Sequence, residues 1–151
     1  MARVDKTIEI DAPLTTAYNQ WTQFEEFPRF MGGVEQVVQK GADMVWFKVN
    51  VGGRAVEYDA RIVEQMPDKR IVWRSVAGKK TGGMVEFEPQ GAGQTRVTLD
   101  LMYEPEGALE NVGDMLGFVS NRVKQDLEKF KEFIEARQVE SGAWRGEIHS
   151  S

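Results

Sequence analysis

The chain has 151 residues, 41% of them hydrophobic, which is enough for one domain with a sizeable buried core and too few for two ordinary domains. Its 19 basic and 24 acidic residues give a net charge of -5, and neither sign forms a block that would follow a phosphate backbone or an anionic membrane surface. We therefore expect no nucleic-acid partner. The absence of cysteine excludes disulfides, thiolate metal sites and cysteine nucleophiles.

No targeting or membrane segment is visible in the sequence. The first ten residues, MARVDKTIEI, lack the apolar stretch of a signal peptide. Nowhere do about 18 apolar residues follow one another, which is the length that a helix needs to cross a bilayer. We expect a cytoplasmic protein with no membrane insertion.

The chain begins with a predicted strand and a predicted short helix. Residues 3–11, RVDKTIEID, place β-branched residues among charged ones, a pattern typical of a strand. After Pro13, which suits a first helical turn, Leu14, Tyr18 and Trp21 follow at helical spacing. These residues predict a helix that ends near residue 22.

An aromatic cluster marks a second short helix. Large apolar residues recur there every three or four positions, at Phe24, Phe27, Phe30 and Met31. The pair Gly32 and Gly33 ends this helix and lets the chain turn sharply into the next strand. The cluster either fills the core or closes one end of a pocket, and both alternatives stay open at this point.

From residue 34 to residue 104 the hydrophobic period changes to two. Successive hairpins joined by short connections predict an antiparallel meander. The segment KKTGGMVEF predicts either a flexible lid or an ordinary hairpin turn through Gly82 and Gly83. The predicted strands, each bounded by glycine, proline or aspartate, lie within residues 34–41, 43–53, 54–68, 69–78, 80–91 and 93–105.

Residues 108–137 predict one long amphipathic helix, roughly 45 Å in length. Its apolar stripe needs a cover, and the only apolar surface of matching size is the inner face of the sheet. The stripe consists of Val112, Leu116, Val119, Val123, Leu127, Phe130 and Ile134. Residues 138–151 have no period, and we expect a mobile tail with Trp144 as its only anchor after a single domain over residues 1–137.

The order of these elements resembles a known family. The segments IEIDAPLTTAYNQWTQFEEFPRF, MPDKRIVWRS and GQTRVTLDLMYEPEG are similar to the polyketide cyclase/dehydrase branch of the START-related helix-grip (SRPBCC) superfamily. Coenzyme-Q-binding START-like proteins share the pattern, and the resemblance covers about residues 3–137. It implies an α+β helix-grip fold, in which a curved antiparallel sheet of about seven strands, two short helices and a long C-terminal helix enclose a cavity.

The period of two predicts which strand residues face this cavity. In residues 54–64 we expect Tyr58 to point inward and Asp59 and Arg61 to point outward. The opposite register stays open, and it would bring acid and base side chains into the cavity. Trp46 falls on the outer face, where it could serve a homodimer contact.

The predicted ligand contacts are mainly aromatic and aliphatic. We expect Tyr58, Ser75 and Tyr103 to orient the ligand, with Tyr103 at the rim and its hydroxyl in water. The complete predicted set is Phe27, Phe30, Met31, Phe47, Tyr58, Trp73, Ser75, Phe87, Leu99, Tyr103, Leu116 and Phe118.

Two functions follow from the residues and the resemblance. The first is binding of a hydrophobic small molecule, polyketide-like and aromatic or lipid-like. The alternative is a polyketide cyclase/dehydrase-type enzyme that catalyses aldol ring closure or dehydration, for which the resemblance offers Tyr58, Arg61 and Tyr103 as catalytic candidates. An inward Arg61 would favour the enzyme and an outward one would favour binding. The only histidine, His149, lies in the tail, and no glycine-rich phosphate loop is present, so we expect neither metal nor cofactor.

Overall fold

The computed structural model describes residues 2–51, 53–104 and 112–149, with the side chains of these residues except those of residue 51 and residues 112–116. The strands are β1 (Ala2–Ile10), β2 (Val34–Gln39), β3 (Met44–Val51), β4 (Arg54–Met66), β5 (Arg70–Gly78), β6 (Thr81–Pro89), β7 (Thr95–Tyr103) and β8 (Ile148–His149). The helices are α1 (Leu14–Trp21), the 3₁₀ helix η1 (Phe24–Arg29) and α2 (Val112–Arg137).

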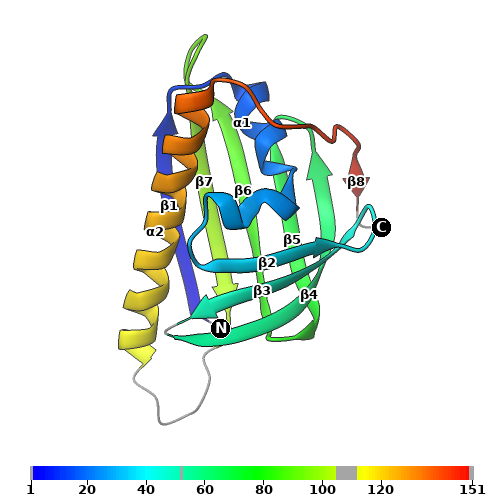
Figure 1. Ribbon diagram of the computed structural model, residues 1–151, viewed down its shortest axis with the longest axis vertical. Helices are drawn as coiled ribbons and strands as arrows, with labels where there is room; N and C mark the ends of the chain where they lie inside the picture. Colours follow the sequence, from blue (N-terminus) through cyan, green and yellow to red (C-terminus); the bar gives the residue numbers. More distant parts are fainter. Residues whose placement is uncertain (1, 52, 105–111, 150–151) are drawn as a thin grey trace.

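The strands of the described residues form one antiparallel sheet. Its order is β1-β7-β6-β5-β4-β3-β2, so the first strand pairs with the last strand of the meander, and the short β8 pairs with β4. Figure 1 shows α2 running along the side of the sheet next to β1, with α1 near the C-terminal end of α2. The predicted helix-grip fold is confirmed. None of the helices described is long and apolar enough to cross a membrane.

The helix α2 is held on the sheet by its apolar stripe. Val123, Leu127, Phe130 and Ile134 are all buried, in the same core cluster as Ile71 of β5. Each such side chain contributes roughly 1.5–3 kcal/mol when it leaves water. The predicted stripe is therefore confirmed over the part of α2 whose side chains the structure describes.

The two short helices carry the aromatic cluster into the core. The rings of Phe24 and Phe27 lie 5.5 Å apart and edge to face, and Trp21 of α1 lies 5.6 Å from Phe27 in a similar arrangement. On the other side, Trp21 lies 4.9 Å from Phe130 of α2. Edge-to-face contacts of this kind add to the stabilisation from burial. The cluster thus joins η1, α1 and α2.

Gly82 and Gly83 lie inside β6, so both predictions for them, a lid and a hairpin turn, are wrong. The turn before β6 lies at Lys79 and Lys80, directly after Gly78, which ends β5 and has a φ of +84°. Gly83 pairs with Trp73 of β5, and a Cβ atom there would lie 2.5 Å from Cζ2 of Trp73 and 2.7 Å from the backbone oxygen of Asp100. Glycine is needed at position 83 because the Trp73 indole lies directly against the backbone.

We expect Gly83→Ala to lower the free energy of unfolding by about 1–3 kcal/mol, because the new methyl group would displace Trp73 and press on a backbone atom. Urea unfolding measures this change. Gly93→Ala is the matched control, since a Cβ atom at Gly93 would meet nothing within 4 Å. Equal losses of stability in the two variants would contradict this explanation of Gly83.

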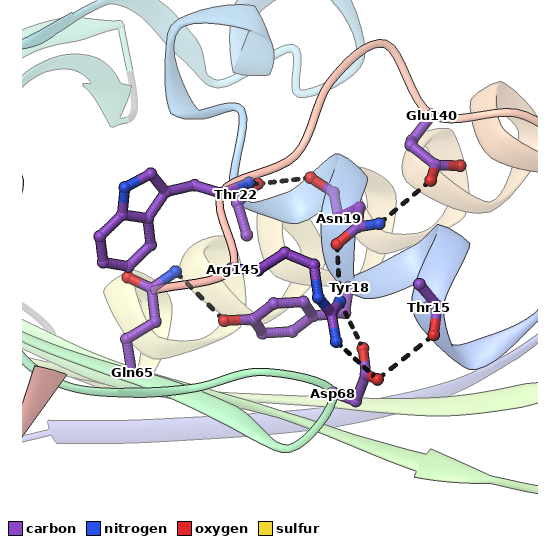
Figure 2. Close-up of polar contacts among 9 residues, drawn as sticks. Thr15, Tyr18, Asn19, Thr22, Gln65, Asp68, Glu140 and Arg145 are labelled. Atoms are coloured by element: carbon purple, nitrogen blue, oxygen red, sulfur yellow. Dashed lines mark hydrogen bonds and ion pairs between the residues drawn. The ribbon is translucent and has the colours of Figure 1, made fainter. Parts of the chain in front are cut away.

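The segment after α2 is bound to α1 and to the turn between β4 and β5. Figure 2 shows Arg145 between the Tyr18 ring and Asp68. The guanidinium donates two hydrogen bonds of 2.9 Å to the two carboxylate oxygens of Asp68 and one of 2.8 Å to Asn19. It also lies 5.6 Å from the centre of the Tyr18 ring. One side chain therefore ties the C-terminal segment to both elements.

Other residues of this segment make further contacts with α1. Ser141 and Gln20 exchange two hydrogen bonds, of 2.9 and 3.0 Å, and the backbone N–H of Trp144 donates to Thr22. The prediction that Trp144 is the only anchor is therefore wrong. The mobility of residues 138–151 and the domain boundary before them stay predictions.

The contact with Arg145 makes the stability of the protein depend on pH. The Arg145 hydrogen bonds hold the pKa of Asp68 below its usual range. Ionised Asp68 therefore stabilises the folded state above the unfolded-state pKa of about 3.9, and this contribution is lost as the pH falls through the lower, folded-state pKa.

We expect Asp68→Asn to lower the free energy of unfolding by about 0.5–1 kcal/mol at neutral pH, a modest value because the pair is partly exposed. The difference from the unsubstituted protein should shrink as the pH is lowered from about 5 toward 2. Urea unfolding at several pH values measures it. Asp43→Asn serves as the control, because the Asp43 side chain is 52% exposed and lies 3.9 Å from Arg61. A difference that stays constant with pH would contradict the role of the ionised Asp68.

Candidate functional site

A cavity of about 300 Å³ lies between the sheet, η1 and the N-terminal half of α2. This volume is at the lower end of the range of about 300–1,000 Å³ that is typical of small-molecule sites. The walls are mainly aromatic and aliphatic. The aromatic side chains among them are Trp21, Phe24, Phe27, Phe47, Tyr58, Trp73, Tyr103 and Phe118.

Strand β4 presents its predicted face to the cavity. Tyr58 lies in the lining, whereas Asp59 and Arg61 do not. Asp59 pairs with Lys40 at 2.9 Å, and the Arg61 side chain is 54% exposed with Asp43 at 3.9 Å. The predicted register is confirmed here, and Arg61 is turned away from the cavity.

Most of the residues predicted to contact a ligand line the cavity. They are Phe27, Met31, Phe47, Tyr58, Trp73, Leu99, Tyr103 and Phe118. Their contact with a ligand stays a prediction. The side chain of Leu116, also predicted as a contact, lies outside the described residues.

Phe30, Phe87 and Ser75 do not line the cavity, so their placement there is wrong. The Phe30 ring lies 4.8 Å from Phe133 of α2, and the Phe87 ring lies 5.4 Å from Tyr18 of α1. Both rings are buried against helices, which for Phe30 agrees with the core-filling alternative. The Ser75 hydroxyl accepts a hydrogen bond of 3.0 Å from the backbone N–H of Thr81 across the turn before β6. All three side chains are used in packing or in a turn.

The Tyr58 phenol is a neutral polar group in an apolar wall. Its ring stacks on that of Phe47, with 5.2 Å between centres and 20° between planes. Burial raises the pKa of Tyr58 well above its usual value. The hydroxyl therefore stays protonated at physiological pH and can donate a hydrogen bond to a bound molecule.

Tyr103 differs from its prediction, because its hydroxyl is not in water. The residue is 7% exposed, and its hydroxyl oxygen is buried with no hydrogen-bond partner among the described residues. Burial raises the pKa of Tyr103 too. Its place in the cavity wall is therefore deeper than at a rim.

Two charged residues of α2, Arg122 and Asp126, line the same cavity, as do Arg54 and Lys79, and none of the four was predicted as a site residue. Nη2 of Arg122 lies 3.3 Å from Oδ1 of Asp126. Burial raises the pKa of Asp126, while the Arg122 charge and a hydrogen bond from the Gly33 backbone oppose the rise. Arg122 and Asp126 each follow a residue of the apolar stripe, Val119 and Val123, by three positions. They therefore lie next to the stripe on the helix surface, and the spacing could have indicated them from the sequence.

Arg122 also explains the two glycines before β2. Neither Gly32 nor Gly33 has a positive φ. A Cβ atom at Gly33 would lie 2.6 Å from Cδ of Arg122, and one at Gly32 would lie 3.2 Å from its Nη2. The glycines therefore leave space for the Arg122 side chain to lie across the chain where η1 turns into β2.

Among the described residues, no group of three or more histidine, aspartate or glutamate side chains could hold a metal ion. His149 lies in β8, where its side chain is 61% exposed and 3.8 Å from Glu147. The polar and charged side chains among the described residues that line the cavity are those of Asn50, Arg54, Tyr58, Lys79, Thr81, Tyr103, Arg122 and Asp126.

The chain belongs to the family described as polyketide cyclase/dehydrase and lipid transport, whose model matches residues 10–132. The predicted resemblance is thereby confirmed. A Streptomyces lincolnensis protein, called the uncharacterized 17.2 kDa protein in the melC2-rnhH intergenic region, is 45% identical over 149 residues, 98% of this chain and 99% of its own. Membership of this family implies a cavity that binds hydrophobic ligands.

Solved structures of other proteins have the same fold. A Deinococcus radiodurans protein is 25% identical with a TM-score of 0.72, over 91% of this chain and 99% of its own. The Zhui aromatase/cyclase from Streptomyces sp. R1128 is 18% identical with a TM-score of 0.75, over 95% of this chain and 99% of its own. The second likeness concerns the fold alone.

The three tyrosines of the chain allow a direct test of the buried site. Burial raises the pKa of Tyr18, Tyr58 and Tyr103, so the folded state holds its phenol protons above the unfolded-state pKa of about 10. Stability should be complete below about pH 10 and fall as the pH rises toward the folded-state values.

We expect an absorbance titration of tyrosinate in the folded protein to have no transition near pH 10. The transition should return to about 10 in concentrated urea. Tyr58→Phe should remove one phenol from the urea titration without producing a transition near 10 in the folded state. A normal transition of any tyrosine in the folded protein would contradict its burial.

Proposed function

We propose that the protein binds one hydrophobic small molecule, an aromatic polyketide-like or a lipid-like compound, in the cavity beside α2. The observation that carries this proposal is the apolar wall of the cavity, to which η1, four strands of the sheet and α2 all contribute aromatic side chains. The family to which the chain belongs supports it.

Apolar burial gives such a ligand moderate affinity. A molecule that buries about 400 Å² of apolar surface gains roughly 10 kcal/mol, of which at least about 4 kcal/mol is lost with its freedom of movement. The remainder corresponds to dissociation constants of tens of micromolar. Polar groups in the wall, such as the Tyr58 hydroxyl, would have to supply tighter binding and orientation.

The outward position of Arg61 favours binding over the alternative, a cyclase or dehydrase. Ring closure by that alternative would use acid and base side chains inside the cavity. Of the three candidates that the resemblance offers, Tyr58 and Tyr103 line the cavity and Arg61 does not. The phenols of Tyr58 and Tyr103, with their raised pKa values, are suited to hydrogen bonding rather than to removing a proton at neutral pH, and the one carboxylate in the described lining, that of Asp126, is ion-paired with Arg122.

We expect native mass spectrometry of the purified protein to show a co-purifying compound that organic extraction removes and incubation restores. Val56→Phe should reduce the bound fraction several-fold, because Val56 lines the cavity and the larger ring would occupy part of its volume. The matched control is Val76→Phe, at an exposed position of β5 that does not line the cavity. Equal binding by both variants would contradict the cavity as the site.

A further inference from the structure

The described lining of the cavity has the opposite charge to the chain as a whole. Its charged side chains are three cations and one carboxylate, those of Arg54, Lys79, Arg122 and Asp126, whereas the chain has a net charge of -5. Arg122 and Asp126 form an ion pair, with Nη2 of Arg122 3.3 Å from Oδ1 of Asp126. Arg54 and Lys79 therefore give the described lining an excess of positive charge.

The burial of the lining residues shows where the cavity opens. Trp21 and Phe27 are 3% and 6% exposed, so the wall at the short helices is buried. Phe118 is 45% exposed, and Arg54 and Ala55 are exposed as well. The beginning of β4 and the N-terminal half of α2 therefore border the opening, and Arg54 lies beside it.

Lys79 lies close enough to Arg54 to share a ligand group with it. Lys79 directly follows β5, and its backbone N–H donates a hydrogen bond of 3.1 Å to the carbonyl oxygen of Glu57. Glu57 follows Arg54 by three positions in β4, which is about 10 Å along the strand. Both cationic side chains are long and flexible, and both line the cavity. They can therefore meet one group placed at this end of the cavity.

Positive charge at the opening selects the polar group of a ligand. Both side chains are donors only, since an arginine has five N–H donors and a lysine has three. Arg54 and Lys79 each interact with another group of the protein, yet several donors on one side chain can serve that group and a ligand oxygen at once. An anionic group would gain charge-assisted hydrogen bonds here, whereas an ammonium group would be repelled.

We propose that the ligand of this cavity is an anionic amphiphile, with an apolar body in the aromatic interior and one anionic group, such as a carboxylate, beside Arg54 and Lys79. The proposal rests on the proposed function and specifies its ligand class. It also gives the direction of the ligand, with the apolar end toward Trp21 and the charged end at the opening. Because Arg54 is exposed and Lys79 is half-buried, the charges contribute selectivity and a moderate gain in affinity.

Three probes with one ring system test the proposal. At pH 7, 2-naphthoate is an anion, 2-naphthalenemethanol is neutral and 2-naphthylmethylamine is a cation. Equilibrium dialysis against the intact protein gives the dissociation constant of each. Burial alone would favour the alcohol, because a carboxylate loses more hydration. We expect 2-naphthoate to bind about 10-fold more tightly than the alcohol, and the amine to bind most weakly. The preference for 2-naphthoate should shrink as the salt concentration rises, because salt screens exposed charges.

Two variants remove the charges at the opening. Lys79→Gln and Arg54→Gln should each weaken the binding of 2-naphthoate about 3- to 10-fold without weakening that of the alcohol. Lys80→Gln is the matched control, because it makes the same change of charge one residue away. The Lys80 side chain is exposed, lies 3.7 Å from Glu104 and does not line the cavity. Lys79→Gln retains the hydrogen bond to Glu57, since that bond involves only the backbone.

The outcomes separate this inference from the proposed function. Binding of none of the three probes would overturn the proposed function and the inference together. Equal or tighter binding of the alcohol or the amine would leave the proposed function standing and overturn the anionic class. A preference for 2-naphthoate that Lys79→Gln and Arg54→Gln leave unchanged, or that Lys80→Gln reduces equally, would overturn the assignment to the two cations. The comparison of probes on the unsubstituted protein does not depend on how well any variant folds.

Discussion

The packing of one amphipathic helix on the concave face of a curved sheet is the constraint on which the rest of this structure depends. Toward the C-terminal end of α2 the contact is close, and Phe130 and Ile134 are completely buried. Nearer its N-terminal end, Phe118 is 45% exposed and lines the cavity with Val119. The cavity therefore lies beside this part of α2, and the close packing lies toward the other end of the helix.

The aromatic cluster forms the wall of this cavity on the side of the short helices. Trp21 of α1 contacts both η1 and α2, so its position determines one wall. The C-terminal segment in turn holds α1 through Arg145 and Ser141 (Figure 2). Residues that do not touch the cavity therefore contribute to its shape through a short chain of contacts.

The polar side chains that line the cavity come from several elements. Tyr58 offers one hydroxyl in an aromatic wall, Arg54 and Lys79 add two positive charges, and Arg122 and Asp126 form an ion pair on α2. The two glycines before β2 leave space for the Arg122 side chain, which lies across them. An apolar wall with a small number of placed polar groups is what a site needs in order to combine affinity with orientation.

Local pattern determined the elements of this protein, and three-dimensional contacts decided the details of its site. The periods of two and of three to four predicted the strands, the long helix and the inward face of β4 up to Ile62, because these periods reflect which side of an element is buried. A bulge between Ile62 and Glu64 then changes the register and buries Gln65, which donates to the Tyr18 hydroxyl. The core position of Phe87 depends on Tyr18, which is far away in the sequence, and the contact of Gly83 depends on the indole of Trp73 in the neighbouring strand. The position of Asp126 depends on Arg122, one helical turn away. No single strand or helix encodes the space between elements, so the cavity was decided only by the tertiary structure.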